Sequence, residues 1–243
     1  MLVAEVNTVM FEHAEKDLKV CLILYENREE FEGLFCKEVL SEEEKSYLKR
    51  VNSIKRAKEY YLGRFWSKKA IQEYTGVDET EFPKIAIVKN VFGFPVLKNN
   101  PEGIEVSIAH QNDYVGAIVH PNQIMMGLDI ENYVEIRPSI TLVADEDEKK
   151  LKPPDMDEKM FCTILWTCKE AIGKCLKVGI GTGISQFKVS NIEVVDGVFY
   201  ISFSKYPQMS AICKQWKDSI YAFAYPKKLH IKLWDRKEIN HEI

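Results

Sequence analysis

The 243-residue sequence lacks several features that would assign it to common classes of protein. No apolar run approaches the ~18 residues that a membrane-spanning helix requires. The HExxH, GxSxG and P-loop motifs, which mark many metalloproteases, serine hydrolases and nucleotide-binding enzymes, are also absent. The N-terminal stretch carries Glu5, Glu12, Glu15 and Asp17, a composition that argues against a signal or transit peptide. We therefore expect a cytoplasmic protein that does not associate with membranes.

The cysteines form no Cys-x-x-Cys pair, which is a common signature of zinc and redox sites. They are Cys21, Cys36, Cys162, Cys168, Cys175 and Cys213. Three of them fall on one apolar face of a segment with helical periodicity, residues 157–177. This pattern indicates buried thiols in a reducing compartment rather than a metal site or a disulfide framework.

Charge of neither sign is in large excess. The chain has 33 Lys and Arg against 37 Asp and Glu, and its formal net charge is −4. This balance does not favour nucleic-acid binding. The composition is 46% hydrophobic and 29% charged, which excludes global disorder and allows a substantial core.

The first half of the chain predicts a strand, two helices and further strands. Leu18–Tyr25 is an apolar run typical of a buried strand. Ser41 and Glu44 form a capping box that begins a helix, and Ile54–Tyr74 predicts a longer helix that ends at Gly76. Short strands follow at residues 84–89, 104–109 and 114–119. The last two are expected to form a hairpin.

The second half repeats this order. It predicts a strand at 123–131, helices at 141–151 and 157–177, and strands at 187–195, 198–203 and 219–225. We therefore expect an α+β fold of two similar lobes, a pseudo-dimer, each with a small, mainly antiparallel sheet packed on helices. The expected lobes are residues 1–121 and 122–243. A cleft between two lobes is a favoured ligand site, so we expect the active site at the lobe interface.

Two acidic residues share one face of the predicted strand. Because side chains alternate along a strand, Asp129 and Glu131 lie on one side, roughly 7 Å apart, and Leu128 and Ile130 lie on the other. Neighbouring carboxylates are costly unless a cation or hydrogen-bond donors neutralise them, and their oxygen atoms suit Mg²⁺. The alternative is an edge strand whose acids simply face water.

A row of three side chains follows one face of the predicted long helix. Trp166, Glu170 and Lys174 lie one turn apart, on the side opposite an apolar stripe that includes Cys168. A large aromatic residue on a solvated face is unusual, so the row favours a helix that lines a cleft. The alternative is an exposed Glu–Lys ion pair, which is common and weak.

Basic residues and one histidine form further candidate contacts. His110 lies where a predicted strand ends, a position that suits a phosphate or carboxylate contact and is also common for an ordinary turn residue. Between residues 50 and 69 the basic residues are Arg50, Lys55, Arg56, Lys58, Arg64, Lys68 and Lys69. Such a helix face is commonly just solvated, but it can also bind nucleotide phosphates or an acidic protein.

Together these motifs resemble those of the surfactin-type 4′-phosphopantetheinyl transferases. That family is marked by a G-[IV]-D-[IVL]-E strand and, roughly forty residues later, a W-[ST]-x-K-E-[SA]-x-x-K helix. The corresponding segments here are Gly127-Leu128-Asp129-Ile130-Glu131 and Trp166-Thr167-Cys168-Lys169-Glu170-Ala171-Ile172-Gly173-Lys174. Weaker similarities, in the segments 56–64, 93–95 and 106–111, extend the resemblance over about residues 40–225. The length and doubled layout match the monomeric, two-lobed branch of the family.

The resemblance implies an enzyme that transfers the 4′-phosphopantetheine arm of coenzyme A to a serine of an acyl, peptidyl or aryl carrier protein and releases 3′,5′-ADP. It implies Mg²⁺, or Mn²⁺, held by Asp129, Glu131 and Glu170. Glu170, or a metal-bound water held by Glu131, would accept the serine proton. Lys174 would neutralise or protonate the leaving phosphate.

The resemblance also implies contacts to coenzyme A. The candidates are Ser107, His110, Lys169, Arg50, Arg56 and Lys58. The last three are candidates for the phosphates of the nucleotide or for the acidic helices of a carrier protein. In the segments of weaker similarity, two positions depart from the family: Ala109 replaces the serine that precedes the histidine, and Phe94 replaces the lysine of a Gly-Lys-Pro turn. Neither change affects the implied metal ligands.

Two other interpretations stay open. An inactive family member would bind coenzyme A or a carrier protein without transferring anything, and the changes at Ala109 and Phe94 favour this alternative. Another Mg²⁺-dependent phosphotransfer enzyme could use the same acids. The carrier, whether of fatty-acid, polyketide or nonribosomal-peptide biosynthesis, is left open by the sequence.

Overall fold

The computed structural model describes residues 2–12, 16–27, 37–100, 102–134, 138–181 and 183–241. The chain forms two compact units. Unit 1 comprises Met1–Gln123 together with His230–Ile243, and unit 2 comprises Ile124–Leu229. The sequence-based boundary placed everything after residue 121 in the second lobe, whereas the last strand lies in unit 1. The physical reason is strand pairing, because β12 (His230–His241) pairs antiparallel with β1 (Leu2–Glu12).

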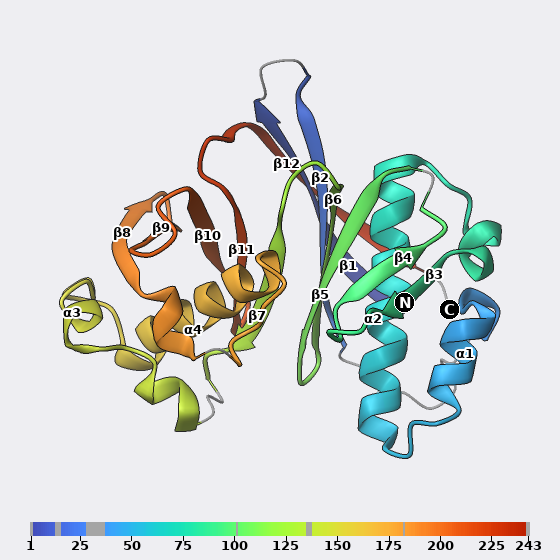
Figure 1. Ribbon diagram of the computed structural model, residues 1–243, viewed down its shortest axis with the longest axis horizontal. Helices are drawn as coiled ribbons and strands as arrows, with labels where there is room; N and C mark the ends of the chain where they lie inside the picture. Colours follow the sequence, from blue (N-terminus) through green and yellow to red (C-terminus); the bar gives the residue numbers. More distant parts are fainter. Residues whose placement is uncertain are drawn as a thin grey trace. The chain divides into compact units, whose positions relative to one another are not determined.

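Unit 1 contains a five-stranded antiparallel sheet with the order β12-β1-β2-β6-β5 (Figure 1). Its other strands are β2 (Leu18–Glu26), β5 (Ile104–Gln111) and β6 (Tyr114–Pro121). The predicted strand at residues 18–25 and the predicted hairpin at 104–119 are therefore confirmed. Neither β1 nor β12 was predicted.

The helix α2 (Ile54–Thr75) packs against β2, β5 and β6. It begins at Ser53, whose side chain accepts a hydrogen bond from the backbone N–H of Arg56. It ends at Gly76, which has φ of 81°, a left-handed conformation that costs glycine less than other residues. These limits agree with the helix predicted over 54–74. Every residue from 61 to 71 is buried, so the middle of the helix is covered on all sides.

Shorter elements complete unit 1. They are the 3₁₀ helices η1 (Lys37–Val39) and η2 (Glu79–Lys84), the helix α1 (Glu42–Leu48), and the strands β3 (Ala86–Lys89) and β4 (Pro95–Lys98). The two strands form a separate antiparallel hairpin, and α1 packs against β3.

Unit 2 contains a second five-stranded antiparallel sheet, with the order β7-β11-β10-β9-β8. Its strands are β7 (Gly127–Asn132), β8 (Val189–Val195), β9 (Val198–Phe203), β10 (Met209–Trp216) and β11 (Ser219–Pro226). The helix α4 (Glu158–Cys175) packs against β7, β10 and β11 (Figure 1). The predicted α+β class, with antiparallel sheets packed on helices, is confirmed.

The helices of unit 2 differ from the prediction in one place. The acidic helix expected at 141–151 is split into the 3₁₀ helix η3 (Pro138–Leu142) and the short helix α3 (Glu146–Lys149). Asp145 caps α3, because its side chain accepts hydrogen bonds from the backbone at the start of that helix, and this fixes a new helix start inside the predicted one. A further 3₁₀ helix, η4 (Ile184–Phe187), precedes β8.

Five of the six cysteines lie in the described residues, and all five are buried and free of disulfide bonds. Burial raises the pKa of Cys21 to about 12, so its thiol stays protonated at neutral pH. The prediction of buried, reduced thiols is confirmed for these five. Cys36 lies outside the described residues. In the part of the chain that is described, no helix has the length and apolar character needed to span a membrane.

The capping box predicted at Ser41 and Glu44 belongs to a larger buried network in unit 1. Glu44 is fully buried and accepts hydrogen bonds from the backbone N–H groups of Ser41 (2.9 Å) and Ile87 (3.0 Å). Lys68 Nζ, also fully buried, donates to Glu44 Oε2 at 2.6 Å and to the carbonyl of Val39 at 2.7 Å. The network therefore joins α1, α2 and β3.

Unit 2 contains the same network. Glu148 caps back onto the N–H of Asp145 (3.1 Å) and accepts a hydrogen bond from the N–H of Val189 (2.8 Å). Lys169 Nζ lies 2.7 Å from the carboxylate of Glu148 and donates to the carbonyl of Val143 at 3.0 Å. In both units the glutamate lies three residues after the cap and the accepting valine two residues before it. The shared network supports the internal repeat that the order of elements predicted.

The Glu44 network predicts the result of removing one partner. The substitution Glu44→Ala leaves the ammonium of Lys68 buried without its counterion, and we expect a loss of about 3–5 kcal/mol in the free energy of unfolding. Urea unfolding followed by circular dichroism measures this loss. Glu43→Ala is the control, since the exposed Glu43 pairs with Lys98 at the surface. Equal losses in both variants would contradict a structural role for the buried pair.

Candidate active site

Strand β7 holds two buried acids. Asp129 is 6% exposed and Glu131 is 4% exposed, while Leu128 and Ile130, on the other face, are also buried. The strand lies at the edge of its sheet, as the alternative interpretation of the sequence assumed. Its acids do not face water, however, because α4 packs on this strand. The two carboxylates are therefore neutralised, at least in part, by groups of the protein.

Gly127 explains how α4 comes so close to β7. A Cβ atom at this position would lie 2.2 Å from the carbonyl oxygen of Ala171 and 2.3 Å from the backbone nitrogen of Cys175. Both atoms belong to the backbone of α4, so they cannot move aside as a flexible side chain would. Any larger residue at position 127 must push the helix away from the strand.

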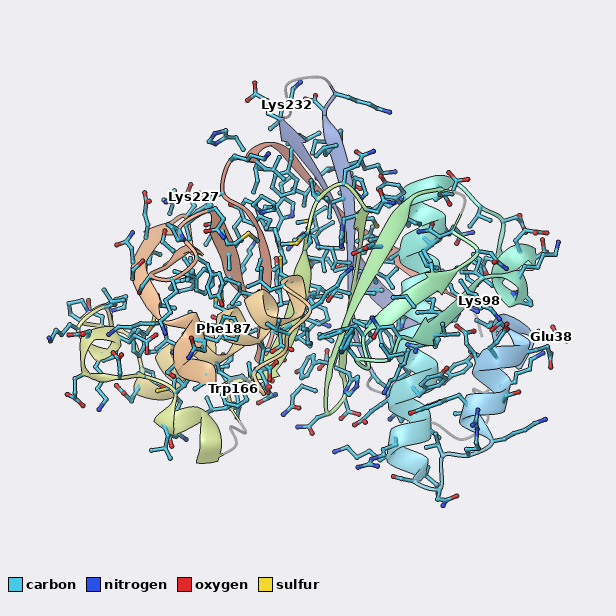
Figure 2. All side chains as sticks on the ribbon, in the orientation of Figure 1. Glu38, Lys98, Trp166, Phe187, Lys227 and Lys232 are labelled. Carbon is cyan, nitrogen blue, oxygen red and sulfur yellow. The ribbon has the colours of Figure 1, made fainter. Side chains whose placement is uncertain are left out.

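The helix row predicted from the sequence faces these acids. Trp166 Nε1 donates a hydrogen bond to Glu131 Oε1 at 3.0 Å, and Lys174 Nζ donates to Asp129 Oδ1 at 2.7 Å (Trp166 is labelled in Figure 2). Glu170 lies midway between them on the same row and is half-buried. The row spans about 12 Å of helix against roughly 7 Å of strand. The strand and the helix therefore bring three carboxylates and one ammonium to one face.

The charge of this group suits a divalent cation. Asp129, Glu131, Glu170 and Lys174 together carry a formal charge of −2, and the first two lie in a buried setting where charge is costly. Carboxylate oxygens are ligands that Mg²⁺ and Mn²⁺ accept. Among the described residues, no three His, Cys, Asp or Glu side chains are grouped closely enough to hold a metal ion. The donors therefore match the cation in kind and charge but are not grouped as a set of three ligands, and Lys174 contacts one of their oxygens.

Lys169, which was predicted to contact coenzyme A, is buried inside unit 2. Its side chain is 1% exposed, and its ammonium contacts Glu148 and Val143 inside unit 2. Successive residues of a helix point about 100° apart, so Lys169 and its neighbour Glu170 face different surroundings. Lys169 therefore stabilises the packing of α4 and is not exposed to a ligand.

Two predicted residues lie on β5 of unit 1. His110 is exposed near the end of the strand, and Ser107 is buried, at 7% exposure. Because they are three residues apart, their side chains point to opposite faces of the strand. Ser107 shares its face with Ala109, so the two predicted contacts lie on different faces of this strand.

The predicted basic residues divide into two groups. Arg56 is exposed in the first turn of α2, and Lys58 is 3.5 Å from Asp113. Arg50 instead lines a cavity of about 490 Å³ in unit 1. The other residues that line it are Glu42, Glu43, Ser46, Tyr47, Tyr60, Arg64, Val88 and Lys89.

The cavity holds two further cationic groups, Arg64 and Lys89, beside aromatic rings. Arg64 is 5% exposed, and its guanidinium lies 4.4 Å from the centre of the Tyr60 ring. Tyr60 stacks on Tyr47, and Lys89 Nζ lies 5.7 Å from the centre of the Tyr47 ring. Burial raises the pKa of Tyr60, an effect that the charge of Arg64 opposes. The four-residue spacing of Tyr60 and Arg64 on α2 is the only sequence signal that could have indicated this arrangement.

The segment that contains β7 and α4 is similar to a known protein family. Residues 125–231 match the model of the 4′-phosphopantetheinyl transferase superfamily. The family resemblance is confirmed. The match includes both motifs of the phosphopantetheinyl transferases, on the strand and on the helix, and it supports phosphopantetheinyl transfer as the general activity. No curated protein matches the chain.

The contact at Gly127 predicts a sensitive position. The substitution Gly127→Ala forces α4 away from β7, and we expect a loss of about 2–3 kcal/mol in the free energy of unfolding, together with a weaker contact between Trp166 and Glu131. Urea unfolding and tryptophan fluorescence measure the two effects. Gly181→Ala is the control, because a Cβ atom there meets nothing within 4 Å. Normal stability of the Gly127 variant would contradict the steric argument.

Proposed function

We propose that this protein transfers the 4′-phosphopantetheine arm of coenzyme A to a serine of an acyl or peptidyl carrier protein and releases 3′,5′-ADP. The observation that carries the proposal is the face at which Asp129 and Glu131 of β7 meet the Trp166–Lys174 row of α4, within a segment that matches the superfamily. We further expect the protein to act as a cytoplasmic monomer.

The proposed reaction is a phosphoryl transfer to an alcohol. The serine Oγ forms a bond to the phosphorus that carries the pantetheine arm, and the bond from that phosphorus to the bridging oxygen breaks. The electron pair of that bond leaves with 3′,5′-ADP. Catalysis of this kind depends mainly on positioning and on neutralising the charge of the diphosphate.

The residues of α4 and β7 divide these tasks. Glu170 accepts the proton of the serine hydroxyl, and Lys174 neutralises or protonates the leaving phosphate. Asp129, Glu131 and Glu170 would hold Mg²⁺, or Mn²⁺, which would supply further charge neutralisation on the diphosphate. Trp166 fixes the carboxylate of Glu131 through its indole N–H.

Residues of unit 1 would bind the nucleotide part of coenzyme A. The cavity that Arg50 lines is our candidate for its phosphates, because Arg64 and Lys89 add two cationic groups there. They would compensate for the lysine that Phe94 replaces, whereas Lys98 is already paired with Glu43 at 2.6 Å. His110, Arg56 and Lys58 are exposed or half-buried candidates for further contacts with coenzyme A or with an acidic carrier.

A protein that binds coenzyme A without transferring the arm is the second candidate. The replacements at Ala109 and Phe94 favour it, because they remove a hydroxyl group and a positive charge from positions that the family uses. The two candidates differ in turnover.

Intact mass spectrometry of apo carrier proteins separates these candidates. We expect a carrier incubated with the enzyme, coenzyme A and Mg²⁺ to gain the mass of one phosphopantetheine arm, and we expect EDTA to prevent the gain. A panel of acyl and peptidyl carriers should be used. Binding of coenzyme A in calorimetry, with no mass gain on any carrier, would instead favour a protein that binds coenzyme A without transferring the arm.

Substitution of the acids tests their assigned roles. We expect Asp129→Asn and Glu170→Gln each to lower kcat on the order of 10²-fold or more, because each removes a charge that the transition state requires. Thermal unfolding should show that both variants stay folded. Glu193→Gln, on the exposed part of β8, is the control and should retain activity. Full activity in a folded Glu170→Gln variant would overturn the assignment of Glu170.

A further inference from the structure

Lys174 supplies the positive charge that contacts Asp129 in the acidic group. Its ammonium lies 2.7 Å from Asp129 Oδ1, while the side chain of Asp129 is only 9% exposed. Lys174 itself lies in the last turn of α4, where the helix dipole favours a positive charge, and its side chain is 25% exposed. The Lys174 side chain therefore contacts a buried carboxylate and is still partly exposed to solvent.

The same ammonium has a second use in the proposed reaction, at the leaving phosphate. The ammonium has three N–H donors but a single positive charge, so attraction to a phosphate weakens its interaction with Asp129. A divalent cation bound to Asp129 would repel the ammonium, whereas a phosphate would attract it. The two ligands therefore act on Lys174 in the same direction.

We propose that Lys174 acts as the counterion of Asp129 in the absence of ligands. The phosphates of coenzyme A would draw the Lys174 ammonium away from Asp129 when the metal binds. Coenzyme and metal would therefore strengthen each other's binding. The proposal rests on the function proposed above. It assigns Lys174 a positioning role in the absence of substrate, in addition to its role at the phosphate. Such coupling is reciprocal by thermodynamic necessity.

Metal affinity measured without turnover tests this role. Titration with Mn²⁺, followed by electron paramagnetic resonance of the free ion, gives the dissociation constant for wild type, Lys174→Met and Lys174→Arg. We expect Lys174→Met to bind Mn²⁺ on the order of tenfold more tightly than wild type in the absence of coenzyme A. Lys174→Arg keeps the positive charge and should bind as wild type does.

A second titration measures the coupling. With coenzyme A present, the affinity of wild type for Mn²⁺ should rise, and the rise should be clearly smaller in Lys174→Met. Lys159→Met is the control for a general change of charge, because Lys159 is exposed in the first turn of the same helix. Thermal unfolding of each variant, with and without Mn²⁺, confirms that the protein is folded.

Several results would overturn the proposal. These are an unchanged or weaker affinity for Mn²⁺ in Lys174→Met, an equal gain in Lys159→Met, or no binding of Mn²⁺ by any variant. The proposed function fails separately, if Mn²⁺ binding behaves as expected but no carrier gains a phosphopantetheine arm. The two failures are therefore distinguishable.

Discussion

The close approach of α4 to β7 is the constraint on which the candidate site depends. It is possible because position 127 has no side chain, and a Cβ atom there would lie within 2.3 Å of two backbone atoms of the helix. At this separation Trp166 and Lys174 reach the acids of β7 at 3.0 and 2.7 Å. A wider gap would admit water, separate these pairs and leave Glu170 far from the strand. The glycine of the strand motif therefore has a steric role in assembling the charged residues.

A different side of α4 is fixed by a second interaction. Lys169 and Glu148 form a buried ion pair, and the equivalent pair in unit 1 joins Lys68 to Glu44. Each glutamate also caps a helix and accepts a backbone N–H from a strand, so one side chain holds three elements. Loss of one partner from such a network is more costly than loss of a surface pair. Adjacent residues of one helix, 169 and 170, thus contribute to packing and to the candidate chemistry respectively.

Much of this could be predicted from the sequence, where the signal is local. The start of α1 follows from its capping box, and the limits of α2 follow from its N-cap serine and the glycine at its end. The alternation along β7 follows from side-chain periodicity. The strands β1, β4, β10 and β12 were not predicted. β1 and β12 pair with each other from opposite ends of the chain and mix charged with apolar residues, whereas β10 forms a hairpin with the neighbouring β11 whose turn at Lys217 and Asp218 was not recognised. The burial of Lys169 and Arg64 was also not predicted. A basic residue on a helix is ordinarily exposed, and only its partners in the folded protein show that it is buried.

The two acids of β7 are difficult to explain by stability alone. Burial of a carboxylate destabilises the folded state unless charges and donors offset the loss of hydration. Here Lys174 contacts Asp129, and Trp166 donates a hydrogen bond to Glu131. Apolar residues of similar size at positions 129 and 131 would pack against α4 without this cost. A protein keeps such residues where the charge itself is used. In a segment that matches the phosphopantetheinyl transferase superfamily, the use that we propose is the neutralisation of a transferred phosphate.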